Sequence, residues 1–316
     1  MPSLFSVDVR VPGTSANLGP GFDVLGLALS IHESVRVTFG GDGPAVRVRA
    51  AGPGSASIPV DSTNLVVRAL RALYRKAGKS LPAVDIQLDV RLPVAGGLGS
   101  SSAAIVGGLV AANESLGRPL DLSALIDLAT DMEGHPDNVA PALTGGLTMA
   151  VRAKDAVRWV AWKEASLFKN LRAVVAVPSF QVPTAKARRA LPARVPRADA
   201  VFNAAHVALL LGAVRSGRWA LLGEAMDDRL HQPYREKLVP GLSAVIGAAR
   251  RAGAHGAALS GAGPSVLALC APAAAPRGAR AMVAAFGRKG SRARSEILKI
   301  DTAGARVFGV SRKRTK

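Results

Sequence analysis

The sequence predicts an α+β fold with two domains. Its 316 residues are too many for one small core, since a domain usually has about 100–200 residues. Apolar and polar residues alternate over 84–90, as in a half-buried strand, whereas apolar residues recur at helical spacing over 64–77. Such segments follow one another without a strict β-α-β order, which favours α+β over a doubly wound parallel sheet.

Each expected element follows from its local pattern. Alternating or continuous apolar runs predict strands at 5–9, 35–39, 46–50, 84–90, 145–151, 173–178 and 306–310, and a strand-turn-strand at 256–270. Helical spacing and end signals predict helices at 64–77, 103–117, 122–132 after an Asp121 cap, 199–215, 219–230, 241–252 and 276–288. A turn through 40–44 would join the second and third strands in a hairpin, and the proline-rich stretch 178–196 marks the domain junction.

Composition excludes several classes of protein. Hydrophobic residues make up 49% and charged residues 20%, which is typical of a globular chain and excludes disorder throughout. A single cysteine, Cys270, excludes a disulfide framework and a cysteine-based zinc site. The chain has no run of 18 apolar residues, and its start lacks the apolar segment of a signal peptide. We therefore expect a cytoplasmic protein with no membrane partner.

The net charge of +19 raises the question of a nucleic-acid partner. Residues 277–316 hold twelve Lys and Arg against two acids, so about half of the excess lies near the C-terminus, where 311–316 reads as a solvated basic tail. No zinc finger, aromatic RNA-binding motif or helix-turn-helix accompanies these charges. The pattern argues against nucleic acid as the main partner and suits a field that attracts phosphorylated and carboxylated substrates.

The strongest local signal is the glycine-serine loop 93–103, PVAGGLGSSSA, which lies between a predicted strand and a predicted helix. Glycines let the backbone approach an anion, and a helix N-terminus offers free N–H groups to phosphate. The loop is neither a Walker A loop nor a dinucleotide fingerprint. A tight turn into a close-packed helix is the structural alternative. The candidate cofactor residues are Pro93, Val94, Ala95, Gly96, Gly97, Leu98, Gly99, Ser100, Ser101, Ser102 and Ala103.

Two further segments favour a ligand over that alternative. Residues 12–23, PGTSANLGPGFD, are rich in turn residues yet carry Asn17 and Asp23, and 260–265, SGAGPS, is another glycine loop between apolar strands. Three such loops in one chain predict a nucleotide and a small polar ligand held between backbones.

These three segments resemble the three motifs of the GHMP kinases in wording, order and spacing. The first motif, together with EGHPDNVAP at 133–141, TAKAR at 184–188 and LHQPYR at 230–235, is similar to the homoserine kinases within that family. The resemblance extends from about residue 8 to about residue 270. It implies phosphorylation of the L-homoserine hydroxyl by ATP, within threonine biosynthesis. The alternative is another GHMP kinase that acts on a different small alcohol.

The resemblance also implies an architecture. An N-terminal ATP-binding domain of the ribosomal-S5-domain-2-like type would span 1–170, and a ferredoxin-like domain would span 171–310, followed by the basic tail 311–316. The active site would lie between the two domains. Family members commonly form homodimers, which nothing in this sequence itself indicates.

Family resemblance assigns the cofactors ATP and Mg²⁺. Glu133 is the expected Mg²⁺ carboxylate, with Ser100 or Ser101 as its hydroxyl partner. A metal also explains an acid at the C-terminal end of a helix, where the helix dipole disfavours negative charge. Asn64 matches a family asparagine at the adenine pocket, and it can equally be a plain N-cap of the helix that follows.

The homoserine site is implied in the same way. Arg188 and Arg235 would hold the carboxylate through paired hydrogen bonds. Asp137, with Asn138 and His135 beside it, would receive the ammonium, and Asp23 would assist on that side. Asn17 would orient the hydroxyl. Gly261 completes the set of substrate-binding residues.

The identity of the catalytic base is left open. Mevalonate kinases carry an aspartate at the position of Asn138, and an asparagine cannot accept a proton as a base. Catalysis by Asn17, Asn138 and Thr184 would then consist of positioning and charge stabilisation, with the γ-phosphate taking the proton. Asp23 is the alternative base.

Overall fold

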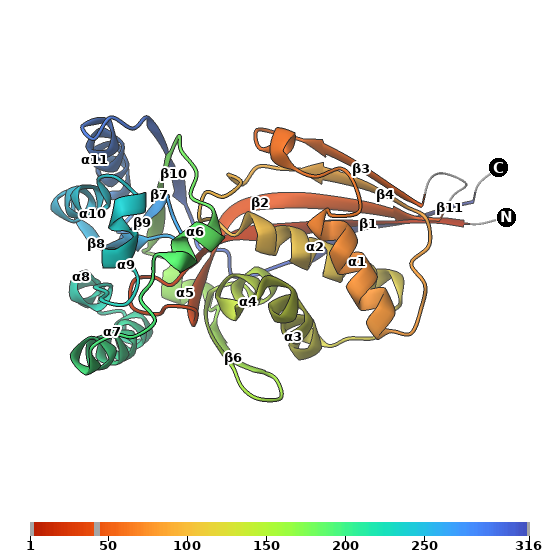
Figure 1. Ribbon diagram of the computed structural model, residues 1–316, viewed down its shortest axis with the longest axis horizontal. Helices are drawn as coiled ribbons and strands as arrows, with labels where there is room; N and C mark the ends of the chain where they lie inside the picture. The colour runs from red at the N-terminus through yellow and green to blue at the C-terminus, as the bar shows by residue number, and fades with distance from the viewer. Residues whose placement is uncertain (1–2, 41–44, 315–316) are drawn as a thin grey trace.

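The computed structural model describes residues 3–40 and 45–314, which form two regions that lie side by side (Figure 1). The first contains a seven-stranded sheet whose main path has the order β11-β1-β2-β4-β3, with β5 paired to β2 and β6 to β5. Its strands are β1 Ser3–Ala16, β2 Leu25–Phe39, β3 Val46–Ala51, β4 Val84–Asp89, β5 Leu147–Arg152, β6 Val157–Trp162 and β11 Arg306–Arg314. The last strand of the chain thus returns to the first sheet.

Four helices cover this sheet in two layers. Helices α2 Ser100–Ser115 and α4 Pro136–Thr144 contact β1 and β2, and helices α1 Leu65–Lys76 and α3 Leu122–Glu133 pack against α2. The side chains of α2 are mostly small, which lets the helix lie close to the sheet and to α1. The start of α2 is thereby fixed at the edge of the region that faces the second sheet (Figure 1).

The second region has a four-stranded antiparallel sheet of order β10-β7-β9-β8. Its strands are β7 Arg172–Pro178, β8 Ala254–Leu259, β9 Val266–Cys270 and β10 Ala293–Leu298, and its covering helices are α10 Leu242–Arg251 and α11 Ala275–Gly287. Counted within the region, the strand order is 4-1-3-2, with one helix of the pair before β8 and the other after β9, which is the ferredoxin-like arrangement. The predicted α+β class and the two expected architectures are therefore confirmed.

Alternation along β7 joins the two regions. Val174 and Ala176 pack in the core beneath α10 and α11, whereas Ala173 and Val175 face the larger core that continues into the first region. Successive strand residues point to opposite faces, so a strand buried on both faces must be apolar at every position. This explains the continuous run AVVAVP and fixes the second sheet against the first region.

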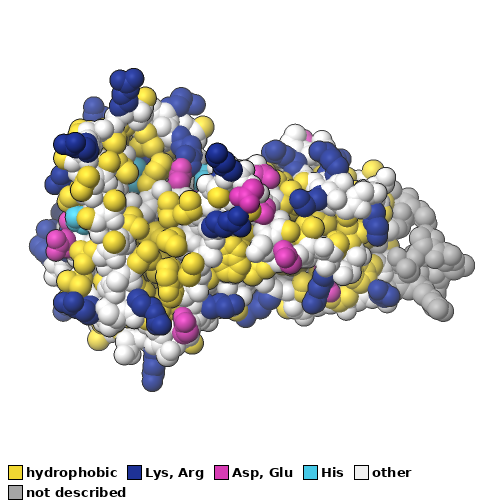
Figure 2. Space-filling model, turned by 90° about the horizontal axis from the view of Figure 1, so that it is seen from below, with side chains coloured by type: hydrophobic (Ala, Val, Ile, Leu, Met, Phe, Trp, Pro, Cys, Tyr) yellow, Lys and Arg dark blue, Asp and Glu magenta, His cyan; other side chains and the backbone are white. Residues whose placement is uncertain are grey.

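Short helices connect the sheets. They are α5 Ala165–Phe168, α6 Thr184–Arg189, α8 Leu222–Ala225 and α9 Gln232–Arg235, with the 3₁₀ turns η1 Ser55–Ser57, η2 Trp219–Leu221 and η3 Glu236–Leu238. Helix α7, Arg197–Ser216, is the one helix within the described residues whose length and composition would suit a membrane span. It carries the polar Asn203, which is buried and bonded to Pro20 O and to Asp228. Figure 2 shows basic side chains scattered over both regions on one face rather than gathered in one patch.

Three expectations about local structure differ from the structure. Strands β2 and β3 are not a hairpin, because β4 lies between them and pairs in parallel with β3; residues 41–44 of the expected turn lie outside the described residues. The helix expected over 219–230 ends after Ala225, because Asp228 turns the chain by accepting hydrogen bonds from the next backbone N–H groups.

The third difference concerns the C-terminus. Residues 311–314 of the expected basic tail belong to β11, where Arg312 pairs with Phe5 on β1, and residues 315–316 lie outside the described part of the chain. The domain boundary at residue 170 stays a prediction.

Candidate active site

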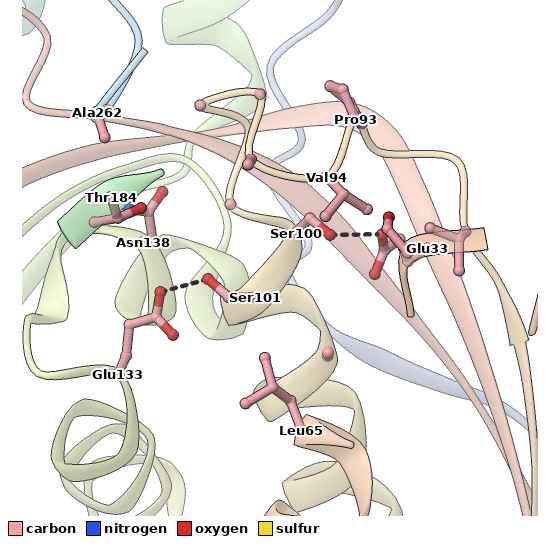
Figure 3. Close-up of a pocket in the computed structure, with 18 of the residues that line it drawn as sticks. Glu33, Leu65, Pro93, Val94, Ser100, Ser101, Glu133, Asn138, Thr184 and Ala262 are labelled. Carbon is pink, nitrogen blue, oxygen red and sulfur yellow. Dashed lines mark hydrogen bonds between the residues drawn. The ribbon is translucent and has the colours of Figure 1, made fainter. Parts of the chain in front are cut away.

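A cavity of about 470 Å³ lies between the two regions. It is lined by the glycine-serine loop, by β2, by the starts of α1 and α4, by α6 and by the loop after β8 (Figure 3), and also by the β1–β2 loop and α9. The three glycine loops singled out in the sequence therefore meet at one place. Their meeting explains why turn residues recur at three distant points in the chain.

Within the glycine-serine loop, the left-handed Gly99 is the N-cap of α2. A Cβ on Gly99 would lie 2.2 Å from the Thr14 hydroxyl oxygen, and one on Gly97, at φ +80°, would lie 2.4 Å from Ser260 O. Ser260 Oγ in turn donates to Gly97 O at 2.6 Å, so the loop after β8 clamps the glycine-serine loop. This packing holds the N-terminus of α2 open toward the cavity, where its free N–H groups suit phosphate.

Glu133, the last residue of α3, points at the start of α2 (Figure 3). Its Oε1 accepts from Ser101 Oγ at 2.6 Å and from Ser102 Oγ at 2.9 Å. Glu133 is therefore bonded to two serine hydroxyls at the start of α2, one of them the expected Ser101, and the Mg²⁺ role of these residues stays a prediction. The second carboxylate oxygen has no hydrogen-bond partner among the described residues, so it can meet a ligand.

Ser100 faces a different carboxylate, which sequence reasoning missed. Its Oγ donates to Oε1 of Glu33 on β2 at 3.3 Å (Figure 3). Burial raises the pKa of Glu33 from its ordinary 4.5 to about 8, against the opposing effects of the Ser100 and Leu92 hydrogen bonds. No motif contains Glu33, and its neighbours His32 and Ser34 are also polar, so no local pattern marked it as a buried acid.

Asn64 is the N-cap of α1, because its Oδ1 accepts from Val66 N at 2.9 Å. Its amide nitrogen donates to Pro59 O at 2.7 Å, which fixes the segment before the helix. The N-cap interpretation is confirmed. Asn64 also lines the cavity with Leu65 and Leu88, so this apolar end is the place where a base could lie, and the adenine contact stays a prediction.

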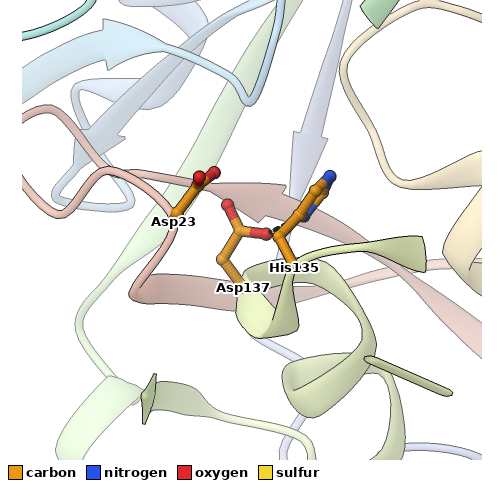
Figure 4. Close-up of side chains that lie close together, drawn as sticks. All are labelled: Asp23, His135 and Asp137. Atoms are coloured by element: carbon orange, nitrogen blue, oxygen red, sulfur yellow. Dashed lines mark hydrogen bonds and ion pairs between the residues drawn. The ribbon is translucent and has the colours of Figure 1, made fainter. Parts of the chain in front are cut away.

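Two aspartates and a histidine meet at the opposite end (Figure 4). Asp137, in the first turn of α4, is 2% exposed and hydrogen-bonded to His135, and Asp23 comes from the loop between β1 and β2. Burial lowers the pKa of His135, but the Asp137 hydrogen bond and the charges of Asp137 and Glu133 outweigh it and raise the pKa overall. The ligand atoms of these three residues lie within 4.8 Å of one another, so they form a compact cluster whose carboxylates suit a small cationic group.

Two arginines balance these acids. Arg188 on α6 binds both oxygens of Asp23, at 2.8 and 3.0 Å. Arg235 on α9 is 2% exposed and donates to Gly261 O at 3.1 Å; burial and the neighbouring charge of Arg188 lower its pKa to about 10. Both guanidinium groups lie over the ring of Phe22, which sequence reasoning also missed. At neutral pH both arginines stay charged.

Three uncharged side chains complete the site. Asn17 donates to Gly261 O at 3.0 Å and accepts from Asp23 N at 3.1 Å, so its side chain joins the first and third glycine loops. Asn138 accepts from the Thr14 hydroxyl at 2.8 Å, which leaves its amide nitrogen for the cavity. Thr184, the first residue of α6, lies opposite Asn138 (Figure 3).

The structure brings nearly all expected site residues to this cavity. Three members of the glycine-serine loop do not line it, namely Leu98, Ser102 and Ala103. Each is buried in the first region: Leu98 and Ala103 pack in its core, and the Ser102 hydroxyl is bonded to Glu133. These buried side chains thus fix the loop against the rest of the first region.

Family models match both regions of the chain: GHMP kinases N terminal domain over residues 64–146, and GHMP kinases C terminal over residues 210–289. The chain is 43% identical over 309 residues to a homoserine kinase of Trichormus variabilis, covering 96% of this chain and all of that protein. The chain belongs to the GHMP kinase family.

Other relatives of this GHMP kinase carry the same name. A homoserine kinase of Desulfitobacterium hafniense is 44% identical over 302 residues, covering 96% of this chain and all of that one. The crystal structure of homoserine kinase from Cytophaga hutchinsonii superposes with a TM-score of 0.86 at 31% identity, covering 96% and 97% of the two chains. Both domains of this GHMP kinase are therefore present and arranged as in a solved relative.

Proposed function

We propose that this GHMP kinase is a homoserine kinase, which transfers the γ-phosphoryl group of ATP to the hydroxyl of L-homoserine and gives O-phospho-L-homoserine for threonine biosynthesis. The relatives that match over nearly the whole chain carry this name. One observation within the molecule carries the substrate choice: the cavity has a phosphate-binding helix start at its centre and two aspartates with two arginines at one end.

The charged end fits an amino acid in size and sign. A homoserine zwitterion offers an ammonium to Asp23 and Asp137 and a carboxylate to Arg188 and Arg235. Its hydroxyl would then lie near Asn138 and Thr184, between the charged end and the glycine-serine loop. A neutral sugar offers no anion to Arg235, and a sterol-precursor alcohol such as mevalonate, which has a carboxylate but no ammonium, offers no cation to Asp23 and Asp137, so both lack charged contacts that homoserine can make.

Positioning accounts for the catalytic residues. Asn138 keeps its amide N–H groups for the cavity because its oxygen is already bonded to Thr14, so it serves as a donor to an oxygen of the substrate or the phosphate. The helix start stabilises the negative charge of the transferring group. Asn17 holds Asp23 and Gly261 in place. If the γ-phosphate takes the proton, then no side chain near Asn138 and Thr184 has to act as the base.

The donor set around Glu133 fits Mg²⁺. Carboxylate and hydroxyl oxygens are the ligands that this cation prefers, and Glu133 presents an unshared oxygen beside the Ser101 hydroxyl. Glu133 and Ser101 would hold the ion, and Ser102 would orient the carboxylate. When bound, the ion would neutralise charge on the phosphates.

A substrate panel tests the function. ADP release with ATP and Mg²⁺ is measured for L-homoserine, mevalonate and galactose at matched concentrations. We expect turnover with homoserine and at most a trace with the other two alcohols. Equal or greater turnover with mevalonate or galactose would favour the alternative, another GHMP kinase. A homodimer and a cytoplasmic location stay predictions.

A further inference from the structure

The Asp23–Arg188 ion pair occupies the place that we assign to the substrate. Both oxygens of the carboxylate are bound by both terminal nitrogens of the guanidinium, at 2.8 and 3.0 Å. The pair crosses from the β1–β2 loop to α6, and its side chains, 34% and 38% exposed, line the cavity. Each ion therefore has an internal partner before any ligand arrives, yet both remain accessible to one.

The other two charges of this end are fixed differently. Asp137 is bound to His135, and Arg235 is held by backbone oxygens of Ala187 and Gly261. Among the described residues, no carboxylate lies within ion-pair distance of Arg235, although Phe22 and the protein around it leave only 2% of it exposed. Arg235 is thus available to a ligand carboxylate, whereas Arg188 must first release the Asp23 carboxylate before it can bind that of a ligand.

We propose that the Asp23–Arg188 pair selects zwitterions by competing with the ligand for its own two ions. This deepens the homoserine kinase proposal and rests on it. An amino acid that opens the pair replaces both halves at once, since its ammonium meets Asp23 and its carboxylate meets Arg188. A ligand with one charge opens the same pair and leaves the other ion unpaired inside the cavity, which is costly. Selection arises from the penalty on the wrong ligand as well as from contacts to the right one.

The competing explanation is that the pair is only a bridge between the two regions and stays closed, with the carboxylate on Arg235 alone. The two explanations predict opposite signs for one substitution. If Asp23 competes with the ligand for Arg188, then removing the charge of Asp23 strengthens the binding of a ligand that has a carboxylate and no ammonium. If the pair is only a bridge, the same substitution strengthens the binding of no ligand.

Asp23→Asn is suited to this test because the chain needs a left-handed residue there. Asp23 has φ +58°, and asparagine tolerates this region at least as well as aspartate. The backbone bond from residue 23 to Asn17 does not involve the altered side chain. Arg188→Gln provides a second variant on the other region. Asp155→Asn, at the exposed Asp155–Arg158 pair between β5 and β6, is the matched control outside the cavity.

Dissociation constants and kcat/KM are measured for L-homoserine, for 4-hydroxybutyrate, which lacks the ammonium, and for 3-aminopropan-1-ol, which lacks the carboxylate. We expect Asp23→Asn to weaken the binding of homoserine. The same variant should bind 4-hydroxybutyrate about tenfold more tightly, because the charged hydrogen bond between Asp23 and Arg188 no longer has to be broken. Arg188→Gln should tighten 3-aminopropan-1-ol, and Asp155→Asn should match the wild type throughout.

Two failures can be told apart. If the wild type turns over homoserine but both variants bind the single-charge analogues no better than it does, the competing pair is wrong and the kinase proposal stands. If the wild type does not turn over homoserine, the kinase proposal fails, and the binding data still decide whether the pair competes. Reduced affinity of both variants for every ligand would overturn the inference.

Discussion

The glycine-serine loop and the charged end of the cavity bind their expected ligands by different means. The loop is one continuous stretch that offers backbone N–H groups and serine hydroxyls at the start of α2, and the acids Glu133 and Glu33 are bonded to its serines. The charged end takes its four ions from the β1–β2 loop, α4, α6 and α9, and two of those ions neutralise each other. Phosphate can be held by a local backbone shape, whereas an amino acid needs separate charges at a fixed spacing.

The largest expected effect concerns Glu133 on the phosphate side. Glu133→Gln should still bind ATP, but kcat should fall by about 10²- to 10⁴-fold if Glu133 is the Mg²⁺ ligand that we propose beside Ser101. Steady-state ADP release at saturating Mg²⁺ measures this. Asp131→Asn is the control, since Asp131 lies on the same helix but pairs with Arg152 at the surface. Near wild-type kcat for Glu133→Gln would refute the metal role.

The charged side should instead show effects that depend on the substrate. Arg235→Ala should lower kcat/KM for homoserine by about ten- to a hundredfold, because it removes a charged hydrogen bond. The wild type should lose a comparable factor when 3-aminopropan-1-ol replaces homoserine. The two changes remove halves of one contact, so they should not add. Full additivity would mean that Arg235 does not touch the carboxylate.

The contrast between a local segment and groups brought together from distant segments also explains how much of the molecule the sequence predicts. Helices α1 and α3 follow from apolar period and from the caps Asn64 and Asp121, which are local signals. The glycine-serine loop is local as well, and its place at the start of α2 is as expected. Both are determined by interactions between residues a few positions apart.

Features that depend on distant partners were missed. Every residue of α4 is buried, so it has no polar face to reveal a helical period, and it contains prolines. The order β2-β4-β3 depends on which strand pairs with which, and the alternation within β3 is the same in either case. Likewise, the sequence places Asp23 and Arg188 in the substrate site, but 165 positions separate them and no local pattern shows that they bind each other.

Glu33 adds a further contrast with the charged end, because this buried acid is bonded to Ser100 and has no ion-pair partner among the described residues. Because its pKa rises from 4.5 to about 8 on folding, the folded state keeps a proton that the unfolded state has lost. Between these two pH values, the free energy of unfolding should therefore decrease with rising pH, by up to a few kcal/mol. Glu33→Gln should lack this contribution. Urea unfolding of the wild type and Glu33→Gln at pH 5, 6.5 and 8 measures this difference. If the free energy of unfolding changes equally with pH in both proteins, then Glu33 is ionised in the folded protein.

The smallest effect is expected far from both ends of the cavity. Strand β11 ends at the opposite end of the first region from the second sheet (Figure 1). Deleting residues 312–316 removes edge pairings of β11, in which Arg312 lies opposite Phe5 and over its ring. Each lost pair at a sheet edge contributes only about 0.2–1 kcal/mol, so the melting temperature should fall by a few degrees. The kcat/KM for homoserine should stay within about twofold, since no residue of β11 lines the cavity. A truncated enzyme that folds but loses homoserine turnover would show that the last strand positions the site from a distance.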